Sequence, residues 1–170
     1  MNDIKNYILK NQPRFLDELA DLLRIPSVST APEHTADVAL CAEFVADHIR
    51  AVGINDVTVF QTKGHPIVYA EYKSSRKNAP TVLFYGHYDV QPVDPLNLWT
   101  NPPFEPTFRD GKVYARGATD DKGQIFLHIK ALESYSNVRG ELPVNVKLLI
   151  EGEEEIGSIH LEEFIKSHQN

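Results

Sequence analysis

The sequence predicts an α/β fold built on a mixed, mostly parallel central sheet. Residues 82–86 are apolar or aromatic without a break up to Gly86, a pattern typical of a strand buried on both faces of a parallel-type sheet. Residues 144–150 form a second, largely apolar strand. Segments with apolar residues at helical spacing stand before, between and after these two runs. Strands that alternate with helices in this way are typical of the α/β class.

Length and composition limit the classes of function. The 170 residues suffice for one domain with a real core, and 42% hydrophobic with 24% charged residues is typical of a globular protein. The formal net charge of −7 argues against nucleic acid or an anionic membrane as the partner. The start lacks a signal peptide's pattern and no apolar run is long enough for a membrane span. The single cysteine, Cys41, favours a reducing compartment, so we expect a cytoplasmic protein.

The first half of the chain predicts two helices and then strands. Apolar residues recur at helical spacing over residues 4–23, where Pro13 indicates either a second helix that begins there or a kink. A second amphipathic helix is expected over residues 35–52. The strands expected next are residues 57–60, residues 67–72 and the central strand that Pro80 opens.

The second half begins with a long proline-rich passage after Asp89, which Trp99 and Phe104 are expected to anchor. A loop of this length inside a domain is usually functional or packed on itself. The elements expected after it are a short strand at residues 112–114, a helix that carries residues 125–135, the strand at residues 144–150 and a short helix at residues 159–168.

Candidate metal ligands recur at three junctions between a predicted strand and the loop after it. They come in pairs: His87 with Asp89, Asp120 with Asp121, and Glu154 with Glu155. Because side chains alternate along a strand, His87 and Asp89 share one face, where one imidazole nitrogen would bind an ion while a carboxylate orients the other. Ligands sit outside the carboxyl ends of strands in open α/β sheets. One basin of imidazole and carboxylate groups therefore explains all three pairs.

Each pair also has a simpler interpretation. Asp120 or Asp121 would suit the cap of the helix that follows, and the glutamates would suit a solvated acidic face. As a common site, imidazole and carboxylate ligands favour zinc, manganese or cobalt, and the lack of thiolates argues against a closed structural zinc site. A hydrolytic site further needs a carboxylate that takes a proton from water. Two adjacent glutamates would divide these tasks, one reaching the metal and its neighbour facing the water.

Four motifs in this order resemble the co-catalytic zinc metallopeptidase family of aminoacylases, acetylornithine and succinyl-diaminopimelate deacylases, glutamate carboxypeptidases and dipeptidases. The motifs are residues 86–92, Trp99 with residues 102–104, residues 116–123 and residues 151–158. The resemblance covers essentially the whole chain. Tyr88 and Gln91 are more similar to the cytosolic dipeptidase and carnosinase branch than to the deacylases. The resemblance implies a three-layer, zinc-exopeptidase-like catalytic domain.

The resemblance also implies roles for the candidate residues. His87 would ligate one zinc ion, with Asp89 as the residue that orients its imidazole. Asp120 would bridge two zinc ions, and Glu155 would be a ligand of one of them. Glu154 would be the general base and proton shuttle.

The loop that presents Asp120 would have its own supports. The resemblance implies that Arg116, Lys122 and Gly123 are structural, and that the peptide bond between Asp120 and Asp121 is cis. Ala115 stands where the family usually has glycine, a small departure.

The activity implied by the resemblance is hydrolysis of the amide bond of dipeptides or similar small peptides through a metal-activated water, with a glutamate as general base. Two Zn²⁺ ions per complete site are implied, with Mn²⁺ or Co²⁺ as alternatives. An N-acyl amino acid deacylase of the same family is the alternative activity. A small peptide or an N-acyl amino acid would then be the substrate, with no nucleic acid or membrane as partner.

One departure from the family lies beyond the fourth motif. Family members carry a further acidic ligand, a distal histidine and an inserted lid domain that mediates dimerisation, and this sequence ends at Asn170 before all of them. We therefore expect residues 1–170 to be the N-terminal part of a truncated metallopeptidase catalytic domain, with a homodimer only for the full-length protein. The alternative for the chain as given is an inactive fragment with an incomplete metal site.

Overall fold

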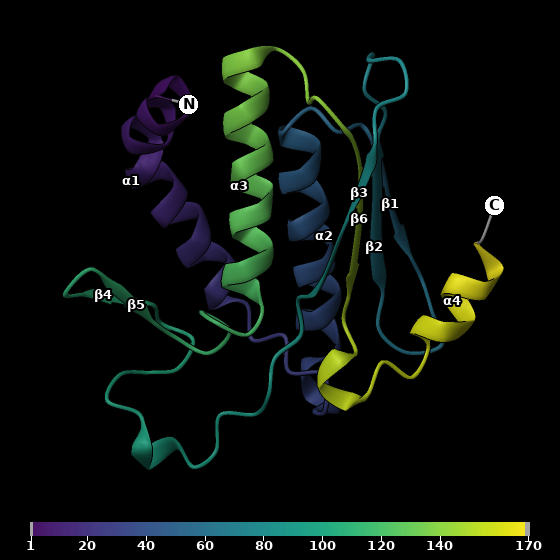
Figure 1. Cartoon of the computed structure of the whole chain (residues 1–170). Coiled ribbons are helices and arrows are strands. Elements are labelled where there is room, and N and C mark those ends of the chain that lie inside the picture. The colour runs from purple at the N-terminus through teal and green to yellow at the C-terminus, as the bar shows by residue number, and fades with distance from the viewer. Residues whose placement is uncertain (1, 169–170) are drawn as a thin grey trace.

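The computed structural model describes residues 2–168 and shows a four-stranded sheet between layers of helices (Figure 1). Helices α1, α2 and α3 lie on one side of the sheet, and the short helix α4 lies on the other. The helices are α1 (Asn2–Arg24), α2 (Thr35–Ala51), α3 (Lys122–Arg139) and α4 (Leu161–Ser167). The strands of the sheet, in spatial order, are β1 (Asp56–Phe60), β2 (Ile67–Tyr72), β6 (Asn145–Glu151) and β3 (Thr81–His87).

The directions of the strands confirm a mixed α/β fold but not a mostly parallel sheet. Among the described strands, β1–β2 and β2–β6 are antiparallel and only β3–β6 is parallel. The prediction of a mostly parallel sheet is therefore wrong for this part of the chain. The physical reason is the short connection between β1 and β2, since six residues join antiparallel neighbours but are too few for the crossover that parallel neighbours need.

Strand β3 differs from its prediction in the same way. It was expected to be central and buried on both faces, yet it lies at the edge of the described sheet, with Leu83 57% and Tyr85 50% exposed. An apolar run in a sequence shows that a strand has surface to bury, but burial depends on which neighbours pack against it.

Helix α1 is continuous through Pro13, so no second helix begins there. An interior proline destabilises a helix, because it removes a backbone hydrogen bond. Tertiary packing offsets this loss, since the carboxyl-terminal half of α1 buries Phe15, Leu22 and Leu23. Helix α2 and strands β1 and β2 agree with their predicted ranges to within one residue.

The main core lies between the sheet and the helices α1, α2 and α3. It is an apolar cluster that includes Val38, Val45, Ile49, Val68, Ile129, Val146 and Leu148. Tyr88 is fully buried in the same cluster, and its hydroxyl donates a hydrogen bond of 2.6 Å to the carbonyl of Pro66. Cys41 is also fully buried, as expected for a small apolar residue.

Three segments meet at one end of the sheet because of its register. His87 at the end of β3 is paired with Glu151 at the end of the parallel strand β6. Val68, near the start of the antiparallel strand β2, is paired with Ile150. The loop between β1 and β2 therefore lies at the same end as the carboxyl ends of β3 and β6. Helix α3 also begins at this end (Figure 1).

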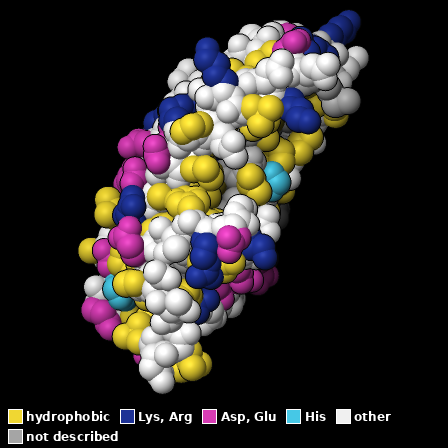
Figure 2. All heavy atoms as spheres, turned by 90° about the vertical axis from the view of Figure 1, so that its left-hand side faces the viewer, with side chains coloured by type: hydrophobic (Ala, Val, Ile, Leu, Met, Phe, Trp, Pro, Cys, Tyr) yellow, Lys and Arg dark blue, Asp and Glu magenta, His cyan; other side chains and the backbone are white. Residues whose placement is uncertain are grey.

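The proline-rich passage leads from β3 to a separate hairpin of β4 (Thr107–Arg109) and β5 (Lys112–Tyr114). Trp99 anchors it, since its indole N–H donates to the carbonyl of Val93 at 2.8 Å and the Arg116 guanidinium stacks over its ring. Leu9 in α1 and Phe108 in this hairpin are exposed. Figure 2 shows hydrophobic side chains among charged ones on the side of the molecule where α1 and the hairpin lie. Among the helices described, none is long and apolar enough to cross a membrane.

Candidate metal centre

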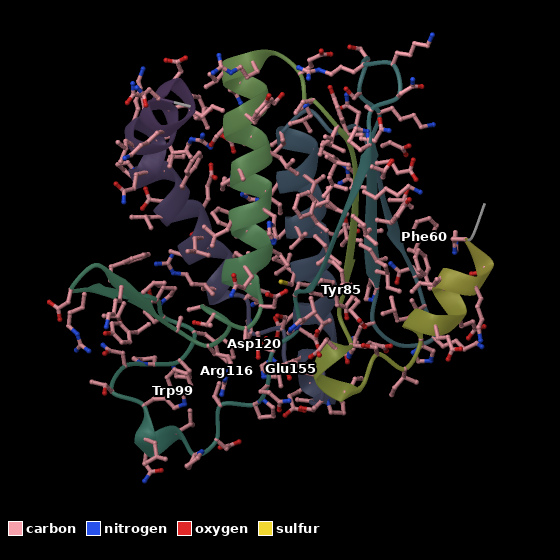
Figure 3. All side chains as sticks on the ribbon, in the orientation of Figure 1. Phe60, Tyr85, Trp99, Arg116, Asp120 and Glu155 are labelled. Carbon is pink, nitrogen blue, oxygen red and sulfur yellow. The ribbon has the colours of Figure 1, made fainter. Side chains whose placement is uncertain are left out.

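Three of the predicted ligands converge at the carboxyl ends of β3 and β6. One ligand atom each from His87, Asp120 and Glu155 lies within 4.8 Å of the others. They come from the end of β3, from the loop before α3 and from the turn after β6. Figure 3 shows Asp120 and Glu155 close together at this end of the molecule. One imidazole and two carboxylates within this span form a donor set that fits a divalent cation. We call these three residues, with Asp89 and Glu154, the metal centre.

The backbone before His87 has to be glycine. A Cβ atom on Gly86 would lie 2.6 Å from a carboxylate oxygen of Asp121 and 2.4 Å from a methyl group of Ile125. The absence of that atom lets the Asp121 carboxylate accept the backbone N–H of His87 at 3.0 Å. Gly86 therefore joins the end of β3 to the loop that carries Asp120.

The two nitrogens of the His87 imidazole face different groups. Nδ1 lies 3.1 Å from the backbone carbonyl of Asp89 and 3.3 Å from its carboxylate. Nε2 lies 3.0 Å from the carboxylate of Asp120 and 3.7 Å from that of Glu154. The Nδ1 side of the ring is therefore held by Asp89, just after the end of β3, while Nε2 faces the other carboxylates.

The charges around His87 favour its protonated form. Burial lowers the pKa of this imidazole, but the hydrogen bond to Asp89 and the charges of Asp89 and Asp121 outweigh burial and raise the pKa to about 9. Without a cation, the proton on His87 partly balances the surrounding carboxylates. A metal ion that binds Nε2 must displace this proton, so binding would release a proton to solvent.

Asp89 is fully buried and connects β3 to the turn after β6. Its carboxylate accepts the backbone N–H groups of Glu154 at 3.3 Å and of Glu155 at 3.1 Å. The same side chain therefore faces His87 and fixes the backbone of both candidate glutamates.

The two glutamates have different surroundings, although both lie in one turn of 3-10 helix, Glu154–Ile156. A carboxylate oxygen of Glu155 accepts a hydrogen bond of 2.7 Å from the side-chain amide of Gln91. The side chain of Glu154 is 44% exposed. Glu155 therefore lies within the converging group, and Glu154 stands at its solvent-facing rim.

The two aspartates before α3 also differ. The peptide bond that joins Asp120 to Asp121 is cis, as the resemblance implies. The Asp120 side chain is 72% exposed and reaches His87. Asp121 is the N-cap residue of α3, but its carboxylate faces β3 and makes no hydrogen bond that caps the helix. Burial raises the pKa of Asp121 against the opposing effect of the N–H of His87.

Lys122 is fully buried beneath this loop. Its ammonium group donates to the carbonyls of Leu22 at 3.2 Å and Ile25 at 2.5 Å, which lie at the end of α1 and just after it. Burial lowers the pKa of Lys122. Arg116 donates to the carbonyl of Pro92 at 2.9 Å and so holds the proline-rich passage near the same loop.

Two residues at the metal centre make contacts that the sequence did not predict. Gln91 belongs to one of the four motifs without a predicted role, although its position two residues after Asp89 places it on the same side of the chain. Glu153 is one of several acidic residues, and nothing in the sequence separates it from its neighbours.

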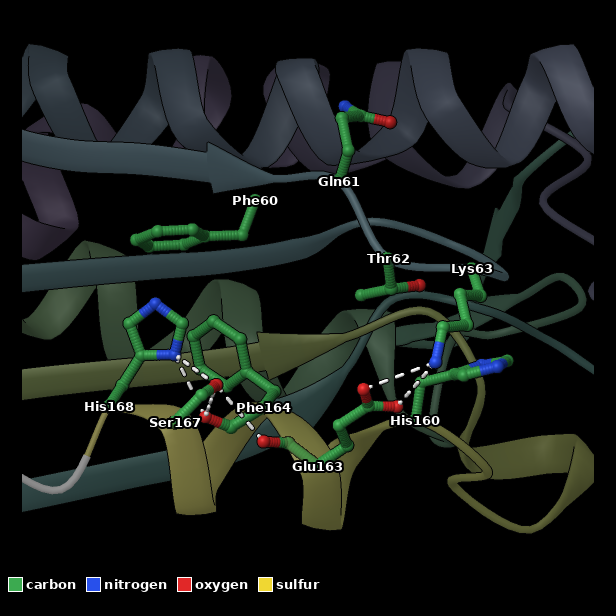
Figure 4. Close-up of a pocket in the computed structure, with 9 residues that line it drawn as sticks. All are labelled: Phe60, Gln61, Thr62, Lys63, His160, Glu163, Phe164, Ser167 and His168. Carbon is green, nitrogen blue, oxygen red and sulfur yellow. Dashed lines mark hydrogen bonds and ion pairs between the residues drawn. The ribbon is translucent and has the colours of Figure 1, made fainter.

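A hollow between the β1–β2 loop and α4, lined by Phe60, Thr62, Lys63, His160 and Phe164 among others, contains none of the predicted site residues (Figure 4).

Comparison with protein families gives a match over just over half of the chain. The family described as "Peptidase family M20/M25/M40" matches residues 83–169. This range contains all five residues of the metal centre.

Individual relatives match nearly the whole chain. The Beta-Ala-His dipeptidase of Rattus norvegicus is 35% identical over 96% of this chain and 36% of its own length. A Cys-Gly metallodipeptidase of Candida albicans is 33% identical over 94% of this chain and 36% of its own length. The crystal structure of human carnosine dipeptidase 1 superposes with a TM-score of 0.90 and 34% identity over 98% of this chain and 37% of that chain. The chain therefore spans about a third of the length of these relatives.

Proposed function

The chain belongs to peptidase family M20/M25/M40, and on this premise we propose that the protein containing it hydrolyses the amide bond of dipeptides or similar small peptides with the help of divalent metal ions. We call the natural protein that contains these 170 residues the whole protein. The relatives that are 33–35% identical carry the names of dipeptidases, which supports this substrate class over N-acyl amino acids. Residues 1–170 would form part of its catalytic domain.

The observation that carries the proposal is the convergence of His87, Asp120 and Glu155 beside an exposed glutamate. His87, Asp120 and Glu155 would hold the metal. When bound, a divalent ion supplies Lewis acidity, which lowers the pKa of water and polarises a carbonyl group. One imidazole and several carboxylates suit Zn²⁺, Mn²⁺ or Co²⁺, and the family resemblance makes Zn²⁺ our first choice.

The protein's own groups would handle the protons. Glu154 stands at the rim, where its carboxylate would accept a proton from the attacking water and return it to the leaving amine nitrogen. Asp89 would keep Nδ1 of His87 oriented so that Nε2 faces the ligand group. The same carboxylate would keep the backbone of Glu154 and Glu155 in place.

Three further properties of the whole protein stay predictions. The unpaired thiol of Cys41 suits a reducing compartment such as the cytoplasm. A homodimer remains expected from the family resemblance. Nucleic acid and membrane remain unfavoured as partners because of the net charge of −7.

Replacement of Glu154 by glutamine tests the proposal directly. In the whole protein we expect Glu154→Gln to lower kcat for a dipeptide by about 10²–10⁴-fold, the usual contribution of a general base, while the bound metal content stays unchanged. Glu162→Gln is a matched control, because this carboxylate is 78% exposed on α4. Full activity of Glu154→Gln would refute the assigned base. Parallel assays with a dipeptide and an N-acetyl amino acid would separate peptidase from deacylase.

A further inference from the structure

Glu153 differs from the glutamates beside it in being buried. Its side chain is 5% exposed, whereas that of Glu154 is 44% exposed. A carboxylate buried to this extent is costly unless hydrogen-bond donors surround it. Its partners therefore show what it holds in place.

The Glu153 carboxylate binds two segments that are distant in the sequence. One oxygen accepts the backbone N–H of His65 at 2.9 Å, in the loop between β1 and β2. The other accepts the backbone N–H of His160 at 3.1 Å, and the imidazole Nδ1 of His160 lies 2.9 Å from it, just before α4. The imidazole of His65 in turn lies 3.0 Å from the carbonyl of Ser29. His160 and residues of the β1–β2 loop line one hollow (Figure 4).

The β1–β2 loop is shaped to receive this carboxylate. A Cβ atom on Gly64 would lie 1.7 Å from a carboxylate oxygen of Glu153, so any other residue at this position would displace it. The hydroxyl of Thr62 accepts the N–H of Gly64 at 2.9 Å and donates to the carbonyl of His65 at 2.7 Å. The loop therefore presents the N–H of His65 toward Glu153 in a fixed shape.

Glu153 also begins the turn that carries Glu154 and Glu155. Its backbone carbonyl accepts the N–H groups of Ile156 at 3.1 Å and Ser158 at 2.8 Å. The N–H groups of Glu154 and Glu155 donate to the Asp89 carboxylate. The turn is thus held by two buried carboxylates, Asp89 from the segment just after β3 and Glu153 from the start of the turn itself.

We infer that Glu153 is a positioning residue, which fixes the backbone of Glu154 and Glu155 by tying their turn to the β1–β2 loop and to the start of α4. This inference rests on the proposed function for what the two glutamates do. A carboxylate suits the place because the donors are two backbone N–H groups and an imidazole nitrogen. A glutamine would offer one acceptor oxygen, and its NH₂ group would face a donor.

The test compares Glu153→Gln with the unchanged whole protein and with Glu162→Gln, the exposed control. In metal-free protein we expect the amide protons of Glu154 and Glu155 to exchange at least about 10-fold faster in Glu153→Gln. Zinc affinity, measured against a competing chelator, should weaken about 10–100-fold, as is usual when a residue that supports a ligand is removed. For the dipeptide, kcat should fall with little change in KM. Unchanged exchange and unchanged zinc affinity, whatever the change in Tm, would overturn the inference.

A second variant disturbs the contact between the Glu153 carboxylate and the β1–β2 loop through a change in the loop. Gly64→Ala leaves every charge in place but pushes the Glu153 carboxylate away. We expect the same direction of change in exchange and in zinc affinity. Failure of both variants to fold would also overturn the inference, because Glu153 would then be required for folding rather than for positioning. If the unchanged protein lacks peptidase activity, the proposed function fails, while exchange and zinc affinity still decide the role of Glu153.

Discussion

Two clusters of charged side chains in this molecule differ in net charge. One lies between α1 and α3 and joins two cations to two carboxylates. We call it the helix network, and its members are Arg14, Glu18, Lys130 and Glu133. The other is the metal centre, which has one imidazole and four carboxylates. The first cluster is neutral by itself, whereas the second carries an excess of negative charge.

The helix network satisfies its charges internally. Lys130 lies 2.5 Å from Glu18 and 2.8 Å from Glu133, and Arg14 pairs with both glutamates. Burial acts to raise the pKa values of the two glutamates, but hydrogen bonds from Lys130 and Arg14 outweigh it, and both pKa values are lowered. The Lys130 ammonium also lies 5.4 Å and 5.0 Å from the rings of Phe15 and Phe126.

The metal centre lacks such internal compensation. The pKa of His87 is raised to about 9 because it is the positive group among several carboxylates, and burial raises the pKa of Asp121. The helix network supplies its own counter-charges, which fits a structural role. In the metal centre carboxylates converge without enough positive charge of their own, so a divalent cation fits as their partner. The comparison therefore separates the two roles on charge balance alone.

Removal of Lys130 should produce the largest effect on stability. Lys130→Met leaves the two glutamates facing each other with Arg14 as their remaining cation, and loss of one member of a buried ion pair typically costs about 3–5 kcal/mol. We expect a decrease of this size in the free energy of unfolding of the whole protein, measured by urea denaturation in the presence of a chelator.

Lys63→Met is the matched control for that variant. Lys63 pairs with Glu163 (Figure 4). The two side chains are 75% and 66% exposed, so removal of Lys63 should cost less than about 1 kcal/mol. Equal losses in the two variants would contradict the structural role of the helix network.

Added metal should produce the next largest effect, and it should depend on the other cluster. Free zinc at about 100 times its dissociation constant should raise the free energy of unfolding by about 2.7 kcal/mol. Asp120→Asn, which removes a charge from the metal centre, should abolish most of this increase, whereas Lys130→Met should retain it. The measurement is urea denaturation with and without zinc. An equal zinc effect in Asp120→Asn and the unchanged protein would show that the ion binds elsewhere.

The sequence predicted much of this contrast, but not all of it. Helix and strand patterns are local, so α2, β1 and β2 were placed closely. Strand alternation and the position of polar residues at strand ends are also local, and they selected three pairs of candidate ligands. The family resemblance then named His87, Asp120 and Glu155 among them, the three residues with ligand atoms within 4.8 Å of one another. Strand direction and the edge position of β3 depend on non-local pairing, so the mostly parallel sheet was wrong.

The sequence also did not predict which charged residues are buried. Glu153 stands in an acidic run and looks like its exposed neighbours, because its partners His65 and His160 come from other segments. Lys130 and Glu133 are likewise three residues apart on a helix, a spacing equally common on solvated surfaces. Which charged residues are buried follows from tertiary packing and has no local signature.

The smallest expected effect is a change of stability with pH, and it distinguishes charge compensation from packing as the interaction that holds α1 to α3. The pKa of Glu133 is lower in the folded protein than in the unfolded chain, because Arg14 and Lys130 stabilise its charged form against burial. The stabilisation from this charge is therefore present above the unfolded pKa of about 4.3 and is lost as the pH falls through the folded pKa. The difference in free energy of unfolding between the unchanged protein and Glu133→Gln should shrink from pH 7 to pH 3.5 by an amount on the order of 1 kcal/mol. Urea denaturation at both pH values, with a chelator to keep metal out of the other cluster, measures it. Glu162→Gln, whose pair with Lys166 is exposed, should show no such change. A difference for Glu133→Gln that does not vary with pH would mean that packing, rather than charge compensation, holds α1 to α3.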